Sequence, residues 1–121
     1  MSRKVLVADD SGTMRKIIIR SLNAVGFNDT VEANDGAEAL ALFGEQQFDL
    51  VLTDWNMPNK TGIELIRDIR ATGSKVPIFM VTTEAEKTRV MDAIQAGVSD
   101  YLVKPFTSEV LRQKLDKFCG A

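Results

Sequence analysis

Histidine is absent from this sequence, and cysteine occurs only once, as Cys119. The missing histidines exclude a catalytic triad built on histidine and a metal site with histidine ligands. One cysteine cannot form a disulfide within the chain, so we expect a reducing, cytoplasmic setting. We interpret Cys119, near the C-terminus, as incidental to any chemistry.

Long apolar runs and a strong excess of one charge are also missing. No run is long enough to span a membrane, and the N-terminus lacks the pattern of a signal peptide. The formal net charge of −2 argues against a general surface for nucleic acid or for anionic lipid. We therefore expect neither a nucleic acid nor a membrane among the partners.

The composition that remains is that of an ordinary globular domain. The 121 residues, 45 % hydrophobic and 26 % charged, suffice for one domain with its own core over residues 1–121. Five short apolar runs predict strands at 4–8, 30–33, 48–54, 76–82 and 101–103. Between and after them, five amphipathic helices are expected to face inward through Met14, Ile17, Ile18, Leu22 and Val25; Ala37, Leu40, Ala41 and Phe43; Ile63, Leu65, Ile66 and Ile69; Val90, Ala93 and Ile94; and Val110, Leu111, Leu115 and Phe118.

This alternation predicts an α/β fold in which five βα units form a doubly wound parallel sheet with helices on both faces. Ligands of such open sheets lie beyond the carboxyl ends of the strands. These ends carry Asp9 and Asp10, Asp54, Thr82 and Lys104. A carboxylate at the end of a buried strand is costly, so its presence at two strand ends indicates a functional site.

Three carboxylates in one crevice raise one another's pKa, and a hard divalent cation relieves this repulsion. Oxygen ligands of this kind suit Mg²⁺. We assign Asp10, Asp54 and the main-chain carbonyl of Asn56 as direct ligands, Asp9 as a ligand through water, and Lys104 as the compensating charge. Asp54, central in the sheet, is then the best nucleophile toward a phosphoryl group, and its product is an acyl phosphate.

The same residues carry a resemblance that covers almost the whole chain. The motifs are Asp9-Asp10, Asp54 with Met57-Pro58 and Gly62, Thr82, and Lys104-Pro105-Phe106. In this order they resemble the signature of bacterial response-regulator receiver domains. The stretch Asp54-Trp55-Asn56-Met57-Pro58, with Glu84 and Tyr101, is most similar to the chemotaxis members of that family.

The resemblance implies a flavodoxin-like sheet with strand order 2-1-3-4-5 and a Mg²⁺-dependent transfer of a phosphoryl group from a sensor histidine kinase to Asp54. It also implies that the domain catalyses only its own phosphorylation and dephosphorylation. Thr82 would then turn toward the phosphoryl group and Tyr101 would move inward. The face formed by the fourth helix, fifth strand and fifth helix would change its affinity for partners. A cis Lys104-Pro105 bond is a further implication.

The partners implied are a chemotaxis sensor kinase, the flagellar motor switch protein and an external phosphatase. We expect a monomeric, stand-alone receiver domain that acts by protein–protein contact, since no effector domain follows the last predicted helix. Trp55, next to the central acid, is expected to be partly exposed and not to take part in the chemistry. Glu84 is either a helix N-terminal charge or a residue that controls access of water.

Two positions depart from the family's pattern. Thr83 stands where alanine or glycine is usual, and this β-branched residue beside the phosphoryl pocket is expected to alter the lifetime of the acyl phosphate. Lys60-Thr61 replaces an apolar and acidic pair before Gly62, which leaves the conformation of that loop open.

Three other functions compete with this interpretation. Within signalling, a phosphorelay intermediate or phosphate sink differs from a motor switch by gaining no affinity for a motor-switch peptide. An aspartate-nucleophile phosphatase of the haloacid-dehalogenase type needs Asp-x-Asp after the first strand, whereas Asp9 and Asp10 are adjacent. A flavodoxin-like binder of flavin phosphate needs an anion-friendly loop there, and two acids would repel the phosphate.

Overall fold

The structure, a computed structural model, describes residues 3–83 and 89–119. In chain order the elements are β1 (Lys4–Ala8), α1 (Gly12–Ala24), β2 (Asp29–Ala33), α2 (Gly36–Glu45), β3 (Leu50–Asp54), α3 (Gly62–Ala71), β4 (Ile78–Thr82), α4 (Val90–Ala96), β5 (Asp100–Val103) and α5 (Ser108–Cys119). The strands pair in parallel in the order β2-β1-β3-β4-β5. The predicted (βα)₅ fold and the strand order implied by the resemblance are both confirmed.

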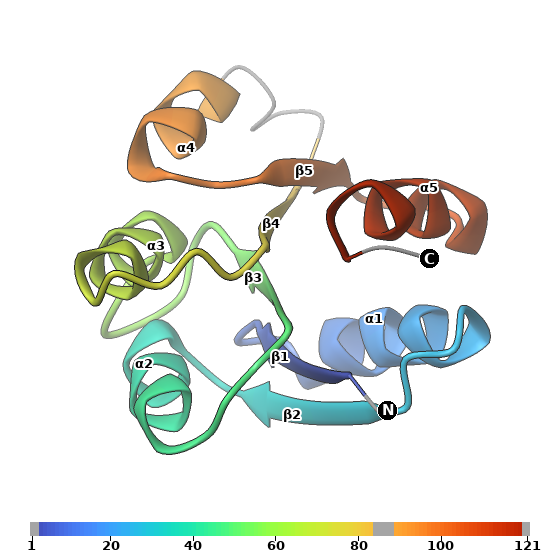
Figure 1. Ribbon diagram of the computed structural model, residues 1–121, viewed down its shortest axis with the longest axis horizontal. Coiled ribbons are helices and arrows are strands. Elements are labelled where there is room, and N and C mark those ends of the chain that lie inside the picture. Colours follow the sequence, from blue (N-terminus) through green and yellow to red (C-terminus); the bar gives the residue numbers. More distant parts are fainter. Residues whose placement is uncertain (1–2, 84–88, 120–121) are drawn as a thin grey trace.

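Helices cover both faces of the sheet. Helices α2, α3 and α4 lie on one face, and α1 and α5 lie on the other (Figure 1). Successive strand residues alternate between the two resulting cores, because side chains of a strand point to opposite faces. In β1, for example, Leu6 packs with the first set of helices, whereas Val5 and Val7 pack with the second. Burial on both faces explains why the strands read as continuous apolar runs.

The predicted inward faces of the helices are only partly right. Leu22, Leu65 and Leu115 are buried as expected. The wrong predictions are Ile17, Ile94 and Val110, which are 46 %, 52 % and 39 % exposed, and Ala37 and Ala41, which are exposed while Gly36 and Ala39 of the same helix are buried. Neighbouring helix residues are about 100° apart around the axis, so a residue beside the buried stripe can face solvent whatever its polarity.

The predicted strand boundaries shift by one or two residues. β3 begins at Leu50 rather than at Phe48, whose ring stacks on Phe43 of α2 with 6.2 Å between the ring centres. β4 begins after Pro77, which has no N–H to donate to the sheet. β2 and β5 each begin one residue earlier than predicted. Residues 84–88 lie outside the described residues, and so does the side chain of Val90, which the sequence predicts to face inward.

Polar side chains cap the starts of three helices. Asp35 accepts a hydrogen bond from the N–H of Glu38 at 2.7 Å, and Thr107 accepts one from the N–H of Val110 at 3.2 Å. Thr61 and Glu64 form a reciprocal capping box at the start of α3. Within the described residues, no helix is both long enough and apolar enough to cross a membrane.

Candidate functional site

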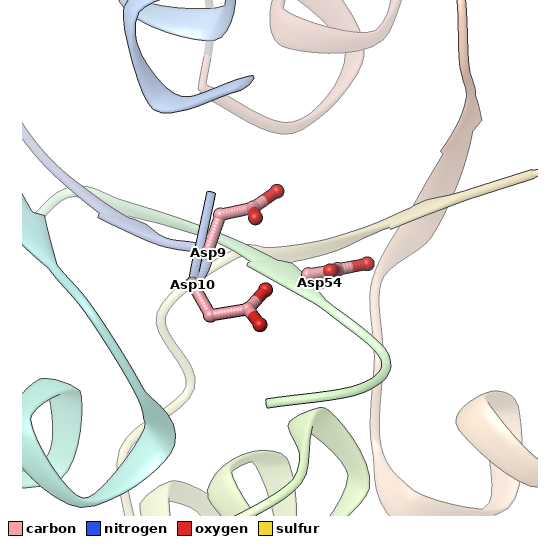
Figure 2. A group of neighbouring side chains, drawn as sticks. All are labelled: Asp9, Asp10 and Asp54. Atoms are coloured by element: carbon pink, nitrogen blue, oxygen red, sulfur yellow. The ribbon is translucent and has the colours of Figure 1, made fainter. Parts of the chain in front are cut away.

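The three acids predicted to form the site lie together beyond the ends of β1 and β3 (Figure 2). Ala8 and Thr53 are register partners in these neighbouring parallel strands, so the residues that follow them, Asp9 and Asp54, also emerge side by side. One carboxylate oxygen from each of Asp9, Asp10 and Asp54 lies within 4.8 Å of the others. The strand register therefore gathers three negative groups into a space that could hold one cation.

Asp9 is the most buried of the three acids, with 1 % of its surface exposed. Its Oδ1 accepts a hydrogen bond from the N–H of Ser11 at 2.9 Å. Among the described residues, its Oδ2 has no hydrogen-bond donor, although the Nζ of Lys104 lies 3.8 Å away. Burial raises the pKa of Asp9, and the Ser11 N–H and the Lys104 ammonium oppose that rise. A buried carboxylate oxygen without a donor indicates a place for a cation or water.

Asp54 and Lys104 form the second half of the site. Asp54 Oδ1 accepts a hydrogen bond from the N–H of Trp55 at 2.8 Å and lies 3.5 Å from the Nζ of Lys104. Burial raises the pKa of Asp54, the neighbouring charge of Asp9 raises it further, and Lys104 lowers it. The N–H of Lys104 donates to the carbonyl oxygen of Thr82 at 2.6 Å, which fixes the exit of β5 beside the end of β4. The implied cis Lys104-Pro105 bond is present.

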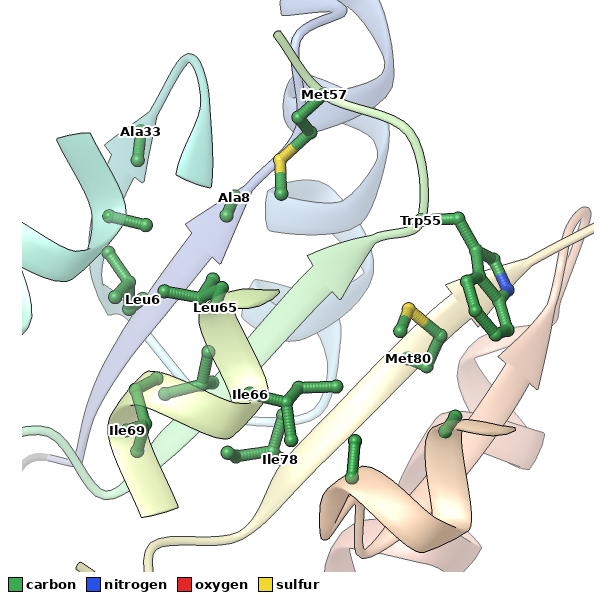
Figure 3. Packing of buried hydrophobic residues seen from close by; sticks show 14 residues of the cluster. Leu6, Ala8, Ala33, Trp55, Met57, Leu65, Ile66, Ile69, Ile78 and Met80 are labelled. Atoms are coloured by element: carbon green, nitrogen blue, oxygen red, sulfur yellow. The ribbon is translucent and has the colours of Figure 1, made fainter. Parts of the chain in front are cut away.

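Trp55 corrects the expectation from the sequence, because it is 2 % exposed rather than partly exposed. Its ring lies at the carboxyl end of β4, near Met80 (Figure 3). Its Nε1–H donates to the hydroxyl of Thr82 at 2.9 Å, and the guanidinium carbon of Arg89 lies 4.5 Å from its ring centre. Trp55 therefore belongs to the core and directly contacts Thr82, which is one of the predicted site residues.

The loop between β3 and α3, left open by the sequence, is held at several points. The side-chain amide of Asn59, whose φ is +69°, donates to Asp35 at 2.7 Å. Lys60 forms an ion pair with Asp68 of α3. The N–H of Gly62 donates to the carbonyl oxygen of Trp55 at 2.9 Å. A Cβ at Gly62 would lie 2.1 Å from the carbonyl oxygen of Asp54, so this close approach requires glycine.

Arg15 contributes to the site, and its role could not be predicted from the sequence. Its Nη1 donates to the main-chain oxygen of Asp9 at 2.6 Å, and its Nε donates to Glu32 of β2 at 2.8 Å. A basic residue one turn into the helix that follows an acid pair was the available signal. Its partners could not be read from spacing, because they come from a different strand and from the main chain.

The remaining predicted residues that the structure describes are not part of the carboxylate cluster. Asn56 is exposed, Thr83 is half-buried, and Glu84 lies outside the described residues. Tyr101 is half-buried, with the Nζ of Lys114 5.2 Å from its ring centre. The structure thus brings together Asp9, Asp10, Asp54 and Lys104.

The donor set fits a hard cation. Three carboxylates face one lysine ammonium, and the oxygens are of the kind that Mg²⁺ takes from proteins. The buried Oδ2 of Asp9, which has no donor within residues 3–83 and 89–119, is the observation that most favours a bound cation or its water.

Comparison with known proteins identifies the family of the chain. Residues 5–116 match the response regulator receiver domain. The chain is 47 % identical to chemotaxis protein CheY of Pseudomonas aeruginosa over 116 residues, 94 % of each chain. It superimposes on chemotaxis response regulator CheY4 of Vibrio cholerae with a TM-score of 0.87 at 34 % identity, covering 98 % of this chain and 99 % of that one.

A second solved structure bears on the metal. The receiver domain of a sensor histidine kinase from Pseudomonas aeruginosa PAO1 has a TM-score of 0.88 at 29 % identity, with all of both chains covered. That protein was solved with a magnesium ion coordinated in its active-site cleft.

Proposed function

Because this chain belongs to the response regulator receiver family, we propose that a histidine kinase phosphorylates it on Asp54 and that Mg²⁺ is required. It is a signalling phospho-switch rather than a true enzyme. The site assignment depends on one observation: Asp9, Asp10 and Asp54 meet at the carboxyl ends of the strands. The Nζ of Lys104 lies within 4 Å of a carboxylate oxygen of Asp9 and of Asp54.

The transfer uses groups that are already in position. An oxygen of Asp54 attacks the phosphorus atom, and the new P–O bond forms as the P–N bond to the kinase histidine breaks, with the bonding pair leaving on nitrogen. The N–H of Trp55 and the Nζ of Lys104 both lie near Asp54 Oδ1. These groups orient the carboxylate, and the ammonium is close enough to stabilise negative charge on the phosphoryl oxygens.

We assign the Mg²⁺ ligands as the sequence predicts them: Asp10, Asp54 and the main-chain carbonyl of Asn56, with Asp9 acting through water. When bound, the ion would neutralise charge on the acids and on the phosphoryl oxygens. The donor-free Oδ2 of Asp9 and the magnesium ion in the related receiver domain support this assignment. Asp9, fixed by Ser11 and Arg15, would hold its free oxygen toward the site.

The function is tested by incubating the protein with acetyl phosphate and Mg²⁺ and measuring its intact mass. We expect one added phosphoryl group in the wild type. Asp54→Asn should abolish the addition because the nucleophile is lost, and chelation of Mg²⁺ should do the same. The control Asp116→Asn, at an exposed position of α5, should behave like the wild type. An added phosphoryl group in Asp54→Asn would refute the assignment.

The output is proposed to be a change in the face formed by α4, β5 and α5, with Thr82 and Tyr101 as switch residues. On α4, Met91 and Ile94 are 63 % and 52 % exposed, and apolar side chains of this kind are what a partner protein covers. The similarity to chemotaxis proteins favours a chemotaxis kinase as donor and the flagellar motor switch protein as target. Three further features stay predictions: an external phosphatase, a monomeric state and a cytoplasmic location.

The alternative within signalling is a phosphorelay intermediate or phosphate sink. Binding of a motor-switch peptide to the phosphorylated and unphosphorylated protein separates the two functions. A gain in affinity on phosphorylation supports the motor switch, and equal affinity supports the phosphate sink.

Thr83 is proposed to limit the access of water to the acyl phosphate. Thr83→Ala is then expected to speed the loss of the phosphoryl group severalfold, measured by intact mass after acetyl phosphate is removed. Thr83→Ser keeps the hydroxyl and removes only the methyl group, so it should follow the alanine variant if bulk is the cause. An unchanged rate in Thr83→Ala would show that this residue does not set the lifetime.

A further inference from the structure

Trp55 contacts the proposed site at two points. Its main-chain N–H holds Asp54 Oδ1 at 2.8 Å, and its indole N–H donates to the hydroxyl of Thr82 at 2.9 Å. Both side chains are buried, with 2 % of Trp55 and none of Thr82 exposed. One residue thus links the acid that is proposed to be phosphorylated to the hydroxyl that is proposed to respond.

The indole contact restricts what Thr82 can do. An indole nitrogen can only donate a hydrogen bond, and a buried donor needs an acceptor. The Thr82 hydroxyl fills that role, and its own proton points to the carbonyl oxygen of Thr83 over a long 3.3 Å. The Thr82 hydroxyl therefore accepts a short hydrogen bond from Trp55 and donates only a long one to the carbonyl oxygen of Thr83. An anionic acceptor could replace that carbonyl oxygen.

A face of the indole ring meets a positive charge just before the start of α4. The guanidinium carbon of Arg89, the residue before this helix, lies 4.5 Å from the centre of the Trp55 ring, within the range of a cation–π contact. A displacement of the indole would change this contact. The contacts from Thr82 to Trp55 and from Trp55 to Arg89 thus connect the end of β4 to the residue that precedes α4.

We propose that Trp55 is a positioning residue that holds Thr82 in its resting orientation and that phosphorylation breaks the Trp55–Thr82 hydrogen bond. This inference rests on the proposed function, because it takes Asp54 as the phosphorylated residue. As Thr82 turns to the phosphoryl oxygen, the indole loses its acceptor and its contact with Arg89 is altered. The Trp55–Thr82 hydrogen bond therefore favours the resting state. When it breaks, the altered contact between the Trp55 ring and Arg89 transmits the change to the start of α4.

The indole N–H can be followed directly, since Trp55 is the only tryptophan in the chain. In the ¹H–¹⁵N spectrum of the full protein, Thr82→Val removes the acceptor and should move the single indole resonance, whereas Thr82→Ser keeps the hydroxyl and should leave it near its wild-type position. On treatment of the wild type with acetyl phosphate and Mg²⁺, the resonance should move toward its position in Thr82→Val.

Intact mass, measured on the same sample, separates the two ways to fail. An added phosphoryl group with an unmoved indole resonance overturns this inference alone. No added phosphoryl group overturns the proposed function, and this inference with it. A resonance that is the same in Thr82→Val and in the wild type would show that the hydrogen bond is not formed in solution.

A second variant guards against misfolding of Thr82→Val. Trp55→Phe keeps an aromatic ring beside Arg89 but removes the donor that favours the resting state. If the switched state reacts faster, loss of one hydrogen bond should raise the rate of phosphorylation by acetyl phosphate about fivefold. The affinity for Mg²⁺ should not change, because the main-chain N–H that holds Asp54 is retained. An unchanged or slower rate contradicts the proposal.

Discussion

Gly62→Ala should destabilise the protein by about 3 kcal/mol and should also abolish most of its phosphorylation. The added Cβ would lie 2.1 Å from the carbonyl oxygen of Asp54 and 3.3 Å from the Cε of Met80. The first of these is a main-chain atom, so the clash cannot be relieved by a side-chain rotation. Either α3 or the end of β3 must move, and the second movement displaces Asp54. Urea denaturation and the acetyl phosphate assay measure the two effects.

Gly44→Ala is the matched control for that substitution. Gly44 lies within α2, and a Cβ there would meet nothing within 4 Å. Alanine is favoured over glycine inside a helix by about 1 kcal/mol, so this variant should be slightly more stable than the wild type and fully phosphorylated. If both glycine variants behave alike, close packing of Gly62 against Asp54 is not what the loop requires.

Asp9→Asn should stabilise the protein by about 1–3 kcal/mol at neutral pH when Mg²⁺ is absent. The carboxylate is buried and its Oδ2 has no donor among the described residues, so its charge is a cost to the folded state. An amide of the same shape removes that charge. With Mg²⁺ added the difference should shrink or reverse, because only the wild type gains the full stabilisation from binding. Asp116→Asn, at an exposed site, should change little.

The pH dependence of this difference has a definite sign. Burial raises the pKa of Asp9 in the folded protein above the value of about 3.9 in the unfolded chain. Between these two values the folded state binds more protons, so stability falls as the pH rises through that window. The advantage of Asp9→Asn should therefore vanish at a pH below about 3.9 and be complete above the raised pKa. An advantage that is constant with pH would show that the carboxylate charge is not its source.

Two acids at helix starts change the pH dependence of stability in the opposite direction. Hydrogen bonds from main-chain N–H groups lower the pKa of Asp35 and of Glu64. Their stabilisation is lost as the pH falls through the lowered values. The stability of the wild type alone, measured against pH, would combine these effects. The difference in stability between the wild type and Asp9→Asn isolates the contribution of Asp9.

The acid cluster could be predicted from the sequence because it depends on strand ends. Apolar runs that stop at Asp9 and at Asp54 fix where two parallel strands end, and the sheet then brings those ends together. The position of Lys104 could be predicted for the same reason, because it comes directly after the last strand. Periodicity and the chemistry of the residues suffice for such features, since no loop path has to be known.

Features that depend on the path of a loop could not be predicted in this way. Trp55 follows the last residue of β3, and its burial results from the turn that carries its ring over the end of β4. The contact between Arg15 and the main chain of Asp9 depends on how α1 leaves the sheet. The spacing of apolar residues predicts Ile17 and Val110 to face inward, but both are exposed, because helix geometry and not residue type decides exposure beside the buried stripe.

The most direct test of the central claim is calorimetric titration of the metal-free protein with Mg²⁺. If Asp9, Asp10 and Asp54 form one cation site, the wild type should show saturable binding of a single ion, and Asp54→Asn should lose most of that affinity while Asp116→Asn keeps it. Binding that is undetectable in the wild type, or equally strong in Asp54→Asn, would contradict the assignment of this carboxylate cluster as the magnesium-dependent phosphorylation site.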